Sequence, residues 1–259
     1  MARYFLKLSY KGGAFNGWQV QENTPNTVQQ VLEEKMAMLL KEKIALTGCG
    51  RTDTGVHAKN YYAHFDAHLP GLLSNKQQWI YKINTVLPPD IAVHDIIPVI
   101  PTAHARFDAT ERQYYYYLSR QKNPFRSAYT WYVYGELDFE LMNKAAQVLL
   151  EYQDFTSFSK LNTQNKTNNC SITRAIWQQT GEEEWRFTIR ANRFLRGMVR
   201  AIAGTLVLVG KNKISLQEFR HIIESKNRAL AGGNAPAHPL FLSGIRYPKT
   251  IFLDSSENK

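Results

Sequence analysis

The order in which hydrophobic periodicities follow one another constrains the fold most, because the same order occurs twice. Strands are expected where apolar and polar residues alternate, and helices where apolar residues recur every three or four positions. The elements expected in the first half are strands at 4–10, 44–46, 60–65 and 91–99, and helices that follow Thr27 and Ser74. Those expected in the second half are strands at 114–119, 172–178, 185–191 and 241–247, and helices that follow Asp138 and Ser215 or begin near Asn192.

In each half this order approximates strand, helix, two strands, helix and strand, which is the split βαβ arrangement. It predicts an α+β protein of two ferredoxin-like or RRM-like halves, each with a largely antiparallel sheet covered by helices on one face. A chain of 259 residues is long enough for two such domains. We expect an N-terminal α+β domain over 1–104, a C-terminal α+β domain over 105–248 and a tail over 249–259.

The charge of the chain is uneven. The 32 Lys and Arg residues exceed the 22 Asp and Glu residues, which gives a net charge of +10. No acidic residue occurs between Glu184 and Glu218, a stretch with five arginines and two lysines. A field of one sign attracts a polyanion, so this excess is consistent with nucleic-acid binding, although a solvated basic face is an equally valid interpretation of charge alone.

Cysteine usage and hydropathy indicate the compartment. With only Cys49 and Cys170, a disulfide framework is excluded and no Cys-x-x-Cys pair is present to hold structural zinc. The first residues lack the apolar run of a signal peptide, and the longest near-apolar run, 201–210, is too short to cross a bilayer. A reducing, cytoplasmic location is the expectation.

Residues 48–58 are dense in reactive and backbone-shaping side chains. Glycines at 48, 50 and 55 permit unusual backbone angles and the close approach of a ligand. Arg51 lies two positions before Asp53, so an extended backbone would place both side chains on one face. A guanidinium favours the ionised form of a neighbouring carboxylate, and an ionised, positioned aspartate can act as a nucleophile or a base. The alternative is a loop in which Asp53 caps a turn and pairs with Arg51.

Several motifs spaced along nearly the whole chain resemble those of the TruA-type tRNA pseudouridine synthases. The segment Gly50-Arg51-Thr52-Asp53-x-Gly55-Val56-His57-Ala58 is similar to the catalytic signature of that family. The other similar segments, in order, are Tyr10-x-Gly12-x-x-Phe15-x-Gly17-Trp18-Gln19-x-Gln21, Leu87-Pro88-x-Asp90-Ile91, His104-Ala105-Arg106-Phe107-x-Ala109-Thr110, Asp154-Phe155-x-x-Phe158 and Asn192-x-Phe194-Leu195-x-x-Met198-Val199-Arg200.

This resemblance implies the pseudouridine synthase fold and an isomerase that converts uridine to pseudouridine at positions 38–40 of the tRNA anticodon stem-loop. It implies Asp53 as the catalytic nucleophile and Tyr114 as the tyrosine that contacts the target base and acts in proton removal. It also implies Arg200 as the arginine that pairs with the aspartate. Arg51, two positions before Asp53, is a further candidate for substrate binding. Members are homodimers that use no cofactor and no metal, so tRNA and a second copy are the expected partners.

The residue types suit those roles. The reaction breaks a glycosidic bond, turns the uracil and joins its C5 to the same sugar carbon, so no net water is needed and a single shielded carboxylate fits the task. Whether Asp53 attacks the sugar, attacks the base or removes a sugar proton stays open. We expect Arg193, Arg196 and Arg200 to share one helical face, with Arg200 turned toward Asp53.

Two other functions compete with this one. A non-catalytic RNA-binding module of the RRM type would have the same strand order, but the sequence has no RNP1-like run and that function leaves residues 51–57 unexplained. A hydrolase could use Cys49 with His57, His64 or His104 as its base, although a cysteine beside glycine is more often a packing residue.

Overall fold

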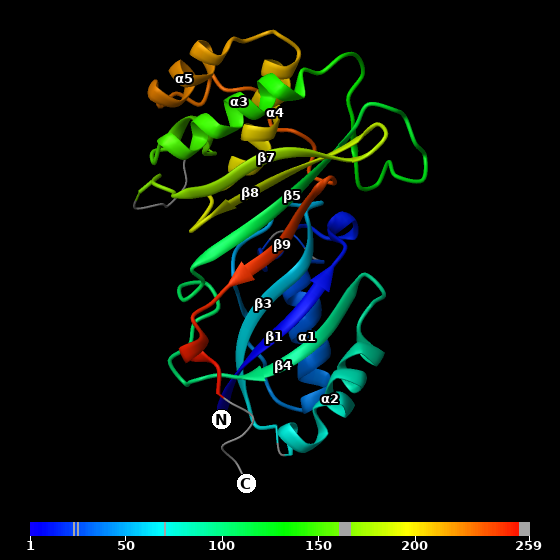
Figure 1. Ribbon diagram of the computed structural model, residues 1–259. Coiled ribbons are helices and arrows are strands. Elements are labelled where there is room, and N and C mark those ends of the chain that lie inside the picture. Colours follow the sequence, from blue (N-terminus) through cyan, green and yellow to red (C-terminus); the bar gives the residue numbers. More distant parts are fainter. Residues whose placement is uncertain (23, 25, 70, 161–166, 254–259) are drawn as a thin grey trace. The chain divides into compact units, whose positions relative to one another are not determined.

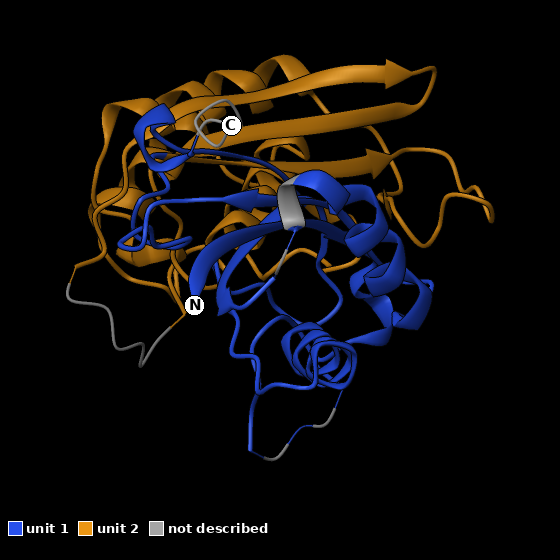
Figure 2. Cartoon of the chain, turned by 90° about the horizontal axis from the view of Figure 1, so that it is seen from below, with its two compact units in different colours: residues 1–110, 242–259 blue, residues 111–241 orange. Residues whose placement is uncertain are grey.

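A computed structural model describes residues 1–22, 24, 26–69, 71–160 and 167–253 (Figure 1). The chain forms two compact units, Met1–Thr110 together with Leu242–Lys259, and Glu111–Phe241 (Figure 2). Each unit mixes strands and helices, so the expected α+β class is confirmed. No helix in the described ranges is both long and apolar enough to cross a membrane.

The first unit has a mainly antiparallel sheet with the order β4-β1-β3, to which β2 adds beside β3. The central strand β1 pairs antiparallel with both neighbours, and helices α1 and α2 lie on one side of this sheet (Figure 1). Its elements are β1 (Ala2–Tyr10), α1 (Val28–Leu40), β2 (Thr47–Gly48), β3 (His57–Ala67), α2 (Leu72–Val86) and β4 (Ile91–Pro98).

The second unit has the order β5-β8-β7, again antiparallel, with the short β6 parallel to β5. The helix-facing side of β8 carries Phe187 and Ile189, whereas Arg186 and Arg190 alternate onto the opposite side. Phe139 of α3 stacks on Trp185 at 3.5 Å between ring centroids, which anchors the helix layer. The elements are β5 (Glu111–Ser119), β6 (Trp131–Tyr132), α3 (Phe139–Val148), β7 (Ile172–Gly181), β8 (Glu184–Ala191), α4 (Met198–Gly210) and α5 (Leu216–Glu224).

The division of the chain differs from the expected ranges at the last strand. In the order along the chain, strand β9 (Leu240–Arg246) is the last strand expected for the second split βαβ half. Only its first two residues belong to the second unit, and the rest belong to the first. The Asn60 side chain donates to the Ser243 carbonyl at 2.8 Å within the first unit. Beyond β9, the Ile100 amide donates to the Ile251 carbonyl, and the Leu253 amide donates to the Pro98 carbonyl. The described part of the expected 249–259 tail is therefore hydrogen-bonded to the end of β4 and the segment that follows it. Residues 254–259 lie outside the described residues.

Three helix starts were predicted correctly and two were not. Thr27 caps α1, and its hydroxyl accepts from the Gln30 amide. Asp138 caps α3, and Ser215 with Glu218 forms a complete capping box before α5. The helix expected to follow Ser74 instead begins at Leu72, with Gly71 as its N-cap. The helix expected near Asn192 begins only at Met198.

The late start of α4 has a backbone cause. Gly197 at its N-cap has a φ of 74°, a left-handed conformation that interrupts a right-handed helix. Arg193 and Arg196 therefore lie in the irregular segment before α4, and only Arg200 lies on the helix. The expectation that all three arginines share a helical face is wrong.

Both units protect the outer strand of their sheet in the same way. In the first unit, the side-chain Nδ2 of Asn84 on α2 donates to the backbone carbonyl of Val93 on β4 at 2.8 Å. The Asn84 Oδ1 accepts from the backbone N–H of the same residue, also at 2.8 Å. In the second unit, Asn143 of α3 bonds the amide and carbonyl of Trp177 on β7 at 2.7 and 3.0 Å. An unpaired strand edge is a template for pairing with another chain, and each asparagine closes one residue of that edge.

We predict that Asn84→Ala and Asn143→Ala each lower the free energy of unfolding by about 1–3 kcal/mol, because each leaves a buried amide and carbonyl without partners. Urea unfolding followed by circular dichroism measures this. Lys144→Ala is the control on α3, because Lys144 makes only an exposed ion pair with Glu140. Equal stability of the asparagine variants and this control would contradict the proposed edge protection.

Candidate active site

Asp53 lies on a tight turn immediately before β3. Its carbonyl accepts a hydrogen bond from the Val56 amide at 3.1 Å, and Gly55 within the turn has a φ of 81°, which favours glycine. The Asp53 side chain is half-buried, whereas the flanking Thr52 and Val56 are buried. The turn is therefore anchored on both sides of the carboxylate.

Three aromatic rings hold the segment that leads into this turn. The rings of Trp18 and Tyr61 stack with centroids 4.1 Å apart, and Tyr10 meets Tyr61 edge-on at 5.4 Å. The Tyr61 hydroxyl donates to the Gly50 carbonyl, and the hydroxyls of Tyr10 and Thr52 are hydrogen-bonded at 2.8 Å. The hydroxyls of both tyrosines therefore bind the loop that carries Asp53.

Two glycines in the first motif let the main chain pass directly against that loop. A Cβ at Gly12 would lie 2.0 Å from the Val56 carbonyl oxygen, and a Cβ at Gly17 would lie 2.6 Å from that of Thr52. The Gly12 amide also donates to Nδ1 of the buried His57 at 2.9 Å. The motif from Tyr10 to Trp18 thus shapes the Asp53 loop. Trp18 is 3% exposed, which supports its alternative role as a core residue.

Arg51 does not form the ion pair that its spacing suggested. Its side chain is exposed, and no ion pair joins it to Asp53 in the described ranges of the chain. The reason is local: Thr52 is pulled into the core by Tyr10, and Asp53 then begins a turn instead of continuing an extended strand. The alternative to a catalytic role, a turn closed by an Arg51–Asp53 ion pair, therefore lacks its central contact.

In the second unit, Tyr114 and Tyr116 project from the helix-facing side of β5. The Tyr114 ring packs edge-on against Phe194, with centroids 5.2 Å apart, and the ring is half-buried. Tyr116 is fully buried and its hydroxyl donates to the Pro236 carbonyl at 3.1 Å. Burial raises the pKa of Tyr116 far above its usual range, although the positive charge of Arg200 opposes the shift. Tyr116 therefore stays protonated as a hydrogen-bond donor.

Arg200 is held by a strap formed by residues 231–236. Its Nε donates to the Ala235 carbonyl at 2.7 Å, and the Ala235 amide donates back to the Arg200 carbonyl at 3.0 Å. The next residue, Pro236, is the acceptor for Tyr116. The strap thus fixes the guanidinium of Arg200 through one edge and connects it to the strand that carries Tyr114.

The strap reaches α4 at backbone distance. A Cβ at Gly204 of α4 would lie 2.1 Å from the Gly233 carbonyl oxygen, and a Cβ at Gly232 would lie 3.1 Å from main-chain atoms of Thr205. The Gly232 amide donates to the buried Thr205 hydroxyl at 2.9 Å. Glycine on both surfaces is what allows this approach. The run of small residues after Ala231 is the sequence signal from which this contact could have been predicted.

The hydrolase alternative gains no support from the geometry. Cys49 is 1% exposed, so its thiol is closed to a substrate. Nδ1 of His64 accepts from the Ala105 amide at 3.1 Å, and burial together with the nearby His104 lowers the pKa of His64 to about 4. Both residues are therefore structural.

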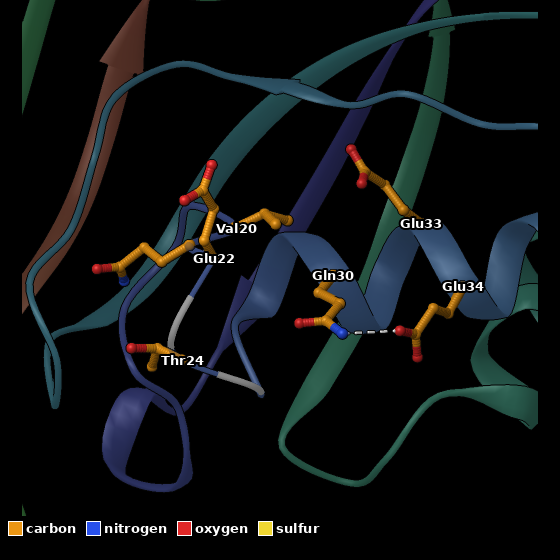
Figure 3. Close-up of a pocket in the computed structure, with 7 residues that line it drawn as sticks. Val20, Glu22, Thr24, Gln30, Glu33 and Glu34 are labelled. Atoms are coloured by element: carbon orange, nitrogen blue, oxygen red, sulfur yellow. Dashed lines mark hydrogen bonds between the residues drawn. The ribbon is translucent and has the colours of Figure 1, made fainter.

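A hollow of the first unit does not suit a phosphate either. It measures about 490 Å³ and is lined on α1 and the preceding loop by residues that include three glutamates, Glu22, Glu33 and Glu34 (Figure 3). Glu33 already accepts from the Leu46 amide at 2.7 Å. A negatively charged wall repels RNA, so we assign the hollow no part in substrate binding.

Comparison with known proteins decides the family. A family model described as tRNA pseudouridine synthase matches residues 145–248. The tRNA pseudouridine synthase A of Parabacteroides distasonis is 51% identical over 252 residues, which cover 97% of this chain and 98% of that protein. The proteins of the same name from Porphyromonas gingivalis and Bacillus subtilis are 48% and 38% identical, over 98% and 93% of this chain and 100% and 97% of theirs.

This chain belongs to the tRNA pseudouridine synthase family. Members are isomerases that convert uridine to pseudouridine in tRNA, so the resemblance noted in the sequence is confirmed. Asp53 comes from the first unit, and Tyr114 and Arg200 from the second. In each unit a backbone contact permitted by glycine holds a segment beside one of these candidate residues, at Gly12 for Asp53 and at Gly204 for Arg200.

We predict that Gly12→Ala lowers kcat for pseudouridine formation by about 100-fold, because its methyl group displaces the Val56 carbonyl and hence the Asp53 turn. The neighbouring Gly13→Ala is a matched control, since a Cβ there meets nothing within 4 Å. Single-turnover assays and thermal melting separate lost activity from unfolding. Equal activity in both variants would show that the turn is not held through Gly12.

We predict that Gly204→Ala lowers kcat by about ten- to 100-fold, because the strap must move away from α4 and release the Arg200 guanidinium. Gly233→Ala, within the strap, is the control because a Cβ there has open space. The Gly204→Ala and Arg200→Gln effects should not add when combined, since both act on the same guanidinium. Additive losses would mean that Gly204 serves stability alone.

Proposed function

We propose that this protein isomerises uridine to pseudouridine at positions 38–40 of the tRNA anticodon stem-loop, with Asp53 as the nucleophile and without a cofactor or metal. The main support is the Asp53 turn, which is closed by the Val56 amide and held by Tyr10, Tyr61 and the neighbouring glycines. A rigid loop can present one carboxylate at a defined position, which is what a reaction with a single covalent centre needs.

The chemistry is balanced within the nucleotide. The bond from the sugar C1′ to the uracil N1 breaks, the base turns, and a bond from C1′ to C5 forms. C5 then loses a proton and N1 gains one, so neither an electron acceptor nor net water is consumed. Asp53 would stabilise the separated state by bonding the sugar, by bonding the base or by removing a sugar proton, and these three routes share the same residue.

The other residues have distinct proposed roles. Tyr114 stacks on the target uracil and its hydroxyl assists removal of the C5 proton; its half-buried ring against Phe194 supports a fixed orientation. Arg200 is the proposed arginine partner of Asp53, and its bond to the Ala235 carbonyl supports a preset guanidinium plane. Arg51, which is exposed, binds the tRNA beside the target nucleotide.

The target uridine lies in a base-paired or stacked arm, so it must leave the stack before Asp53 can reach it. The protein would hold the arm by shape and phosphates, for which the net charge of +10 is suited. The proposal includes a cytoplasmic homodimer, by analogy with the family.

We predict that Asp53→Asn abolishes pseudouridine formation, lowering the rate by about 10⁴-fold or more, while tRNA affinity and melting temperature stay within the range of the parent protein. Asp95→Asn is the control, because its carboxylate lies in the same unit but pairs with Lys76. Pseudouridine mapping in tRNA from cells that lack the protein tests the positions. Turnover by Asp53→Asn would reject Asp53 as the nucleophile. If the cells that lack the protein keep pseudouridine at positions 38–40 and lose it elsewhere, the proposed target is rejected.

A further inference from the structure

The second unit carries a hollow that the proposed chemistry does not use. It has a volume of about 390 Å³, and it lies where β7 meets the end of α3 and the start of β5. Its polar lining comes from Glu111, Gln147, Thr173, Arg174 and Arg190. The size is within the range of ordinary ligand pockets.

Two guanidiniums meet in this hollow. Arg174 on β7 and Arg190 on β8 are directly paired positions of neighbouring strands, so their side chains project from the same face. Both positions lie on the face of the sheet opposite to Phe187 and Ile189, and the hollow that they line also includes Gln147 of α3. Like charges at facing positions repel, and such a pair is unfavourable unless an anion lies between them.

Three other arginines of this unit are paired with carboxylates. Arg120 bonds Glu136 at 2.7 Å, Arg126 bonds Glu184 at 2.9 Å, and Arg220 forms two bonds with Glu151. By contrast, neither Arg174 nor Arg190 forms an ion pair with any residue in the described ranges.

The remaining contacts of the hollow orient the pair without neutralising it. Arg190 donates through Nε to the neutral amide oxygen of Gln113. The carboxylate of Glu111 also lines the hollow, and one of its oxygens accepts from the Thr173 hydroxyl at 3.3 Å. Two positive charges therefore face one negative charge, which leaves the hollow with a net positive charge.

We infer that the Arg174–Arg190 hollow binds a phosphodiester of the tRNA backbone, at a second contact on the opposite side of the sheet from Tyr114 and Arg200. Guanidinium forks match phosphate oxygens in geometry and charge, and they remain charged at every physiological pH. The inference rests on the proposed function only for the identity of the ligand, because tRNA is the polyanion that members of this family modify.

The test measures the affinity of an unmodified tRNA transcript for the full-length protein and for Arg174→Gln, Arg190→Gln and the double variant. Affinity is measured from about 50 to about 300 mM salt, which is wide enough to define the slope of log affinity against log salt. Each single variant should weaken binding about three- to fivefold near 0.1 M salt. Each should also lower the slope of log affinity against log salt by about 0.7–0.9, the value for one lost phosphate contact. The rate at saturating tRNA should not change.

Arg220→Gln is the matched control, because it removes the same charge from the same unit but from a guanidinium held by Glu151. If the hollow variants change the salt slope no more than this control, the inference is overturned. A change in self-association with no change in slope would assign the pair to contact between copies and would also overturn it. Because Arg174 is exposed, Arg174→Gln keeps the test valid if the Arg190 variant unfolds.

These outcomes are separate from those of the proposed chemistry. If Asp53→Asn retains turnover while the hollow variants lose tRNA affinity, the phosphate contact stands and the nucleophile does not. If Asp53→Asn is inactive while the hollow variants bind tRNA like the parent, only the inference about the hollow fails.

Discussion

The side chain of Tyr61 lies between the Trp18 ring and the Gly50 carbonyl, and the geometry of the whole Asp53 loop depends on that position. Tyr61 comes from the middle of β3, so the loop is tied to the centre of a sheet and not to another loop. Gly48 makes this possible, because a Cβ there would lie 2.1 Å from the Tyr61 hydroxyl. A carboxylate mounted in this way is held in place before a ligand arrives, which is the preorganisation that the proposed role of Asp53 requires.

The second unit positions Arg200 and Tyr116 by the same physical means. The strap bonds Arg200 and Tyr116 through successive carbonyls, at Ala235 and Pro236, and it can lie on α4 only because Gly204 has no side chain. Main-chain carbonyls are better positioning groups than flexible side chains, since they lose no rotamer entropy when they bind. In both units, therefore, glycines that seem featureless in the sequence determine where charged or hydroxyl groups point.

Charge in this protein has to be judged from local pairing as well as from the total. The net excess is consistent with an RNA partner, yet many arginines are neutralised by carboxylates within their own unit, such as Arg220 by Glu151. The hollow on α1 is even acidic, although it belongs to a basic chain. The cations available to a phosphate are those that outnumber the carboxylates beside them, and the Arg174–Arg190 pair, which faces only Glu111 in its hollow, meets that condition.

The sequence by itself determined the α+β class, the repeated strand and helix order, the caps at Asp138 and Ser215, and the family, because periodicity, capping and short motifs are local properties of the chain. It predicted Asp53 as the candidate nucleophile for the same reason, and its role remains a proposal. It failed where distant segments compete for the same backbone. Tyr10 draws Thr52 inward and so removes the expected Arg51–Asp53 pair, and Gly197 delays α4 until Met198. The strap on Arg200, the asparagines on the outer strands and the facing arginines were decided only by tertiary structure, since each joins residues whose separation in sequence carries no periodic signal.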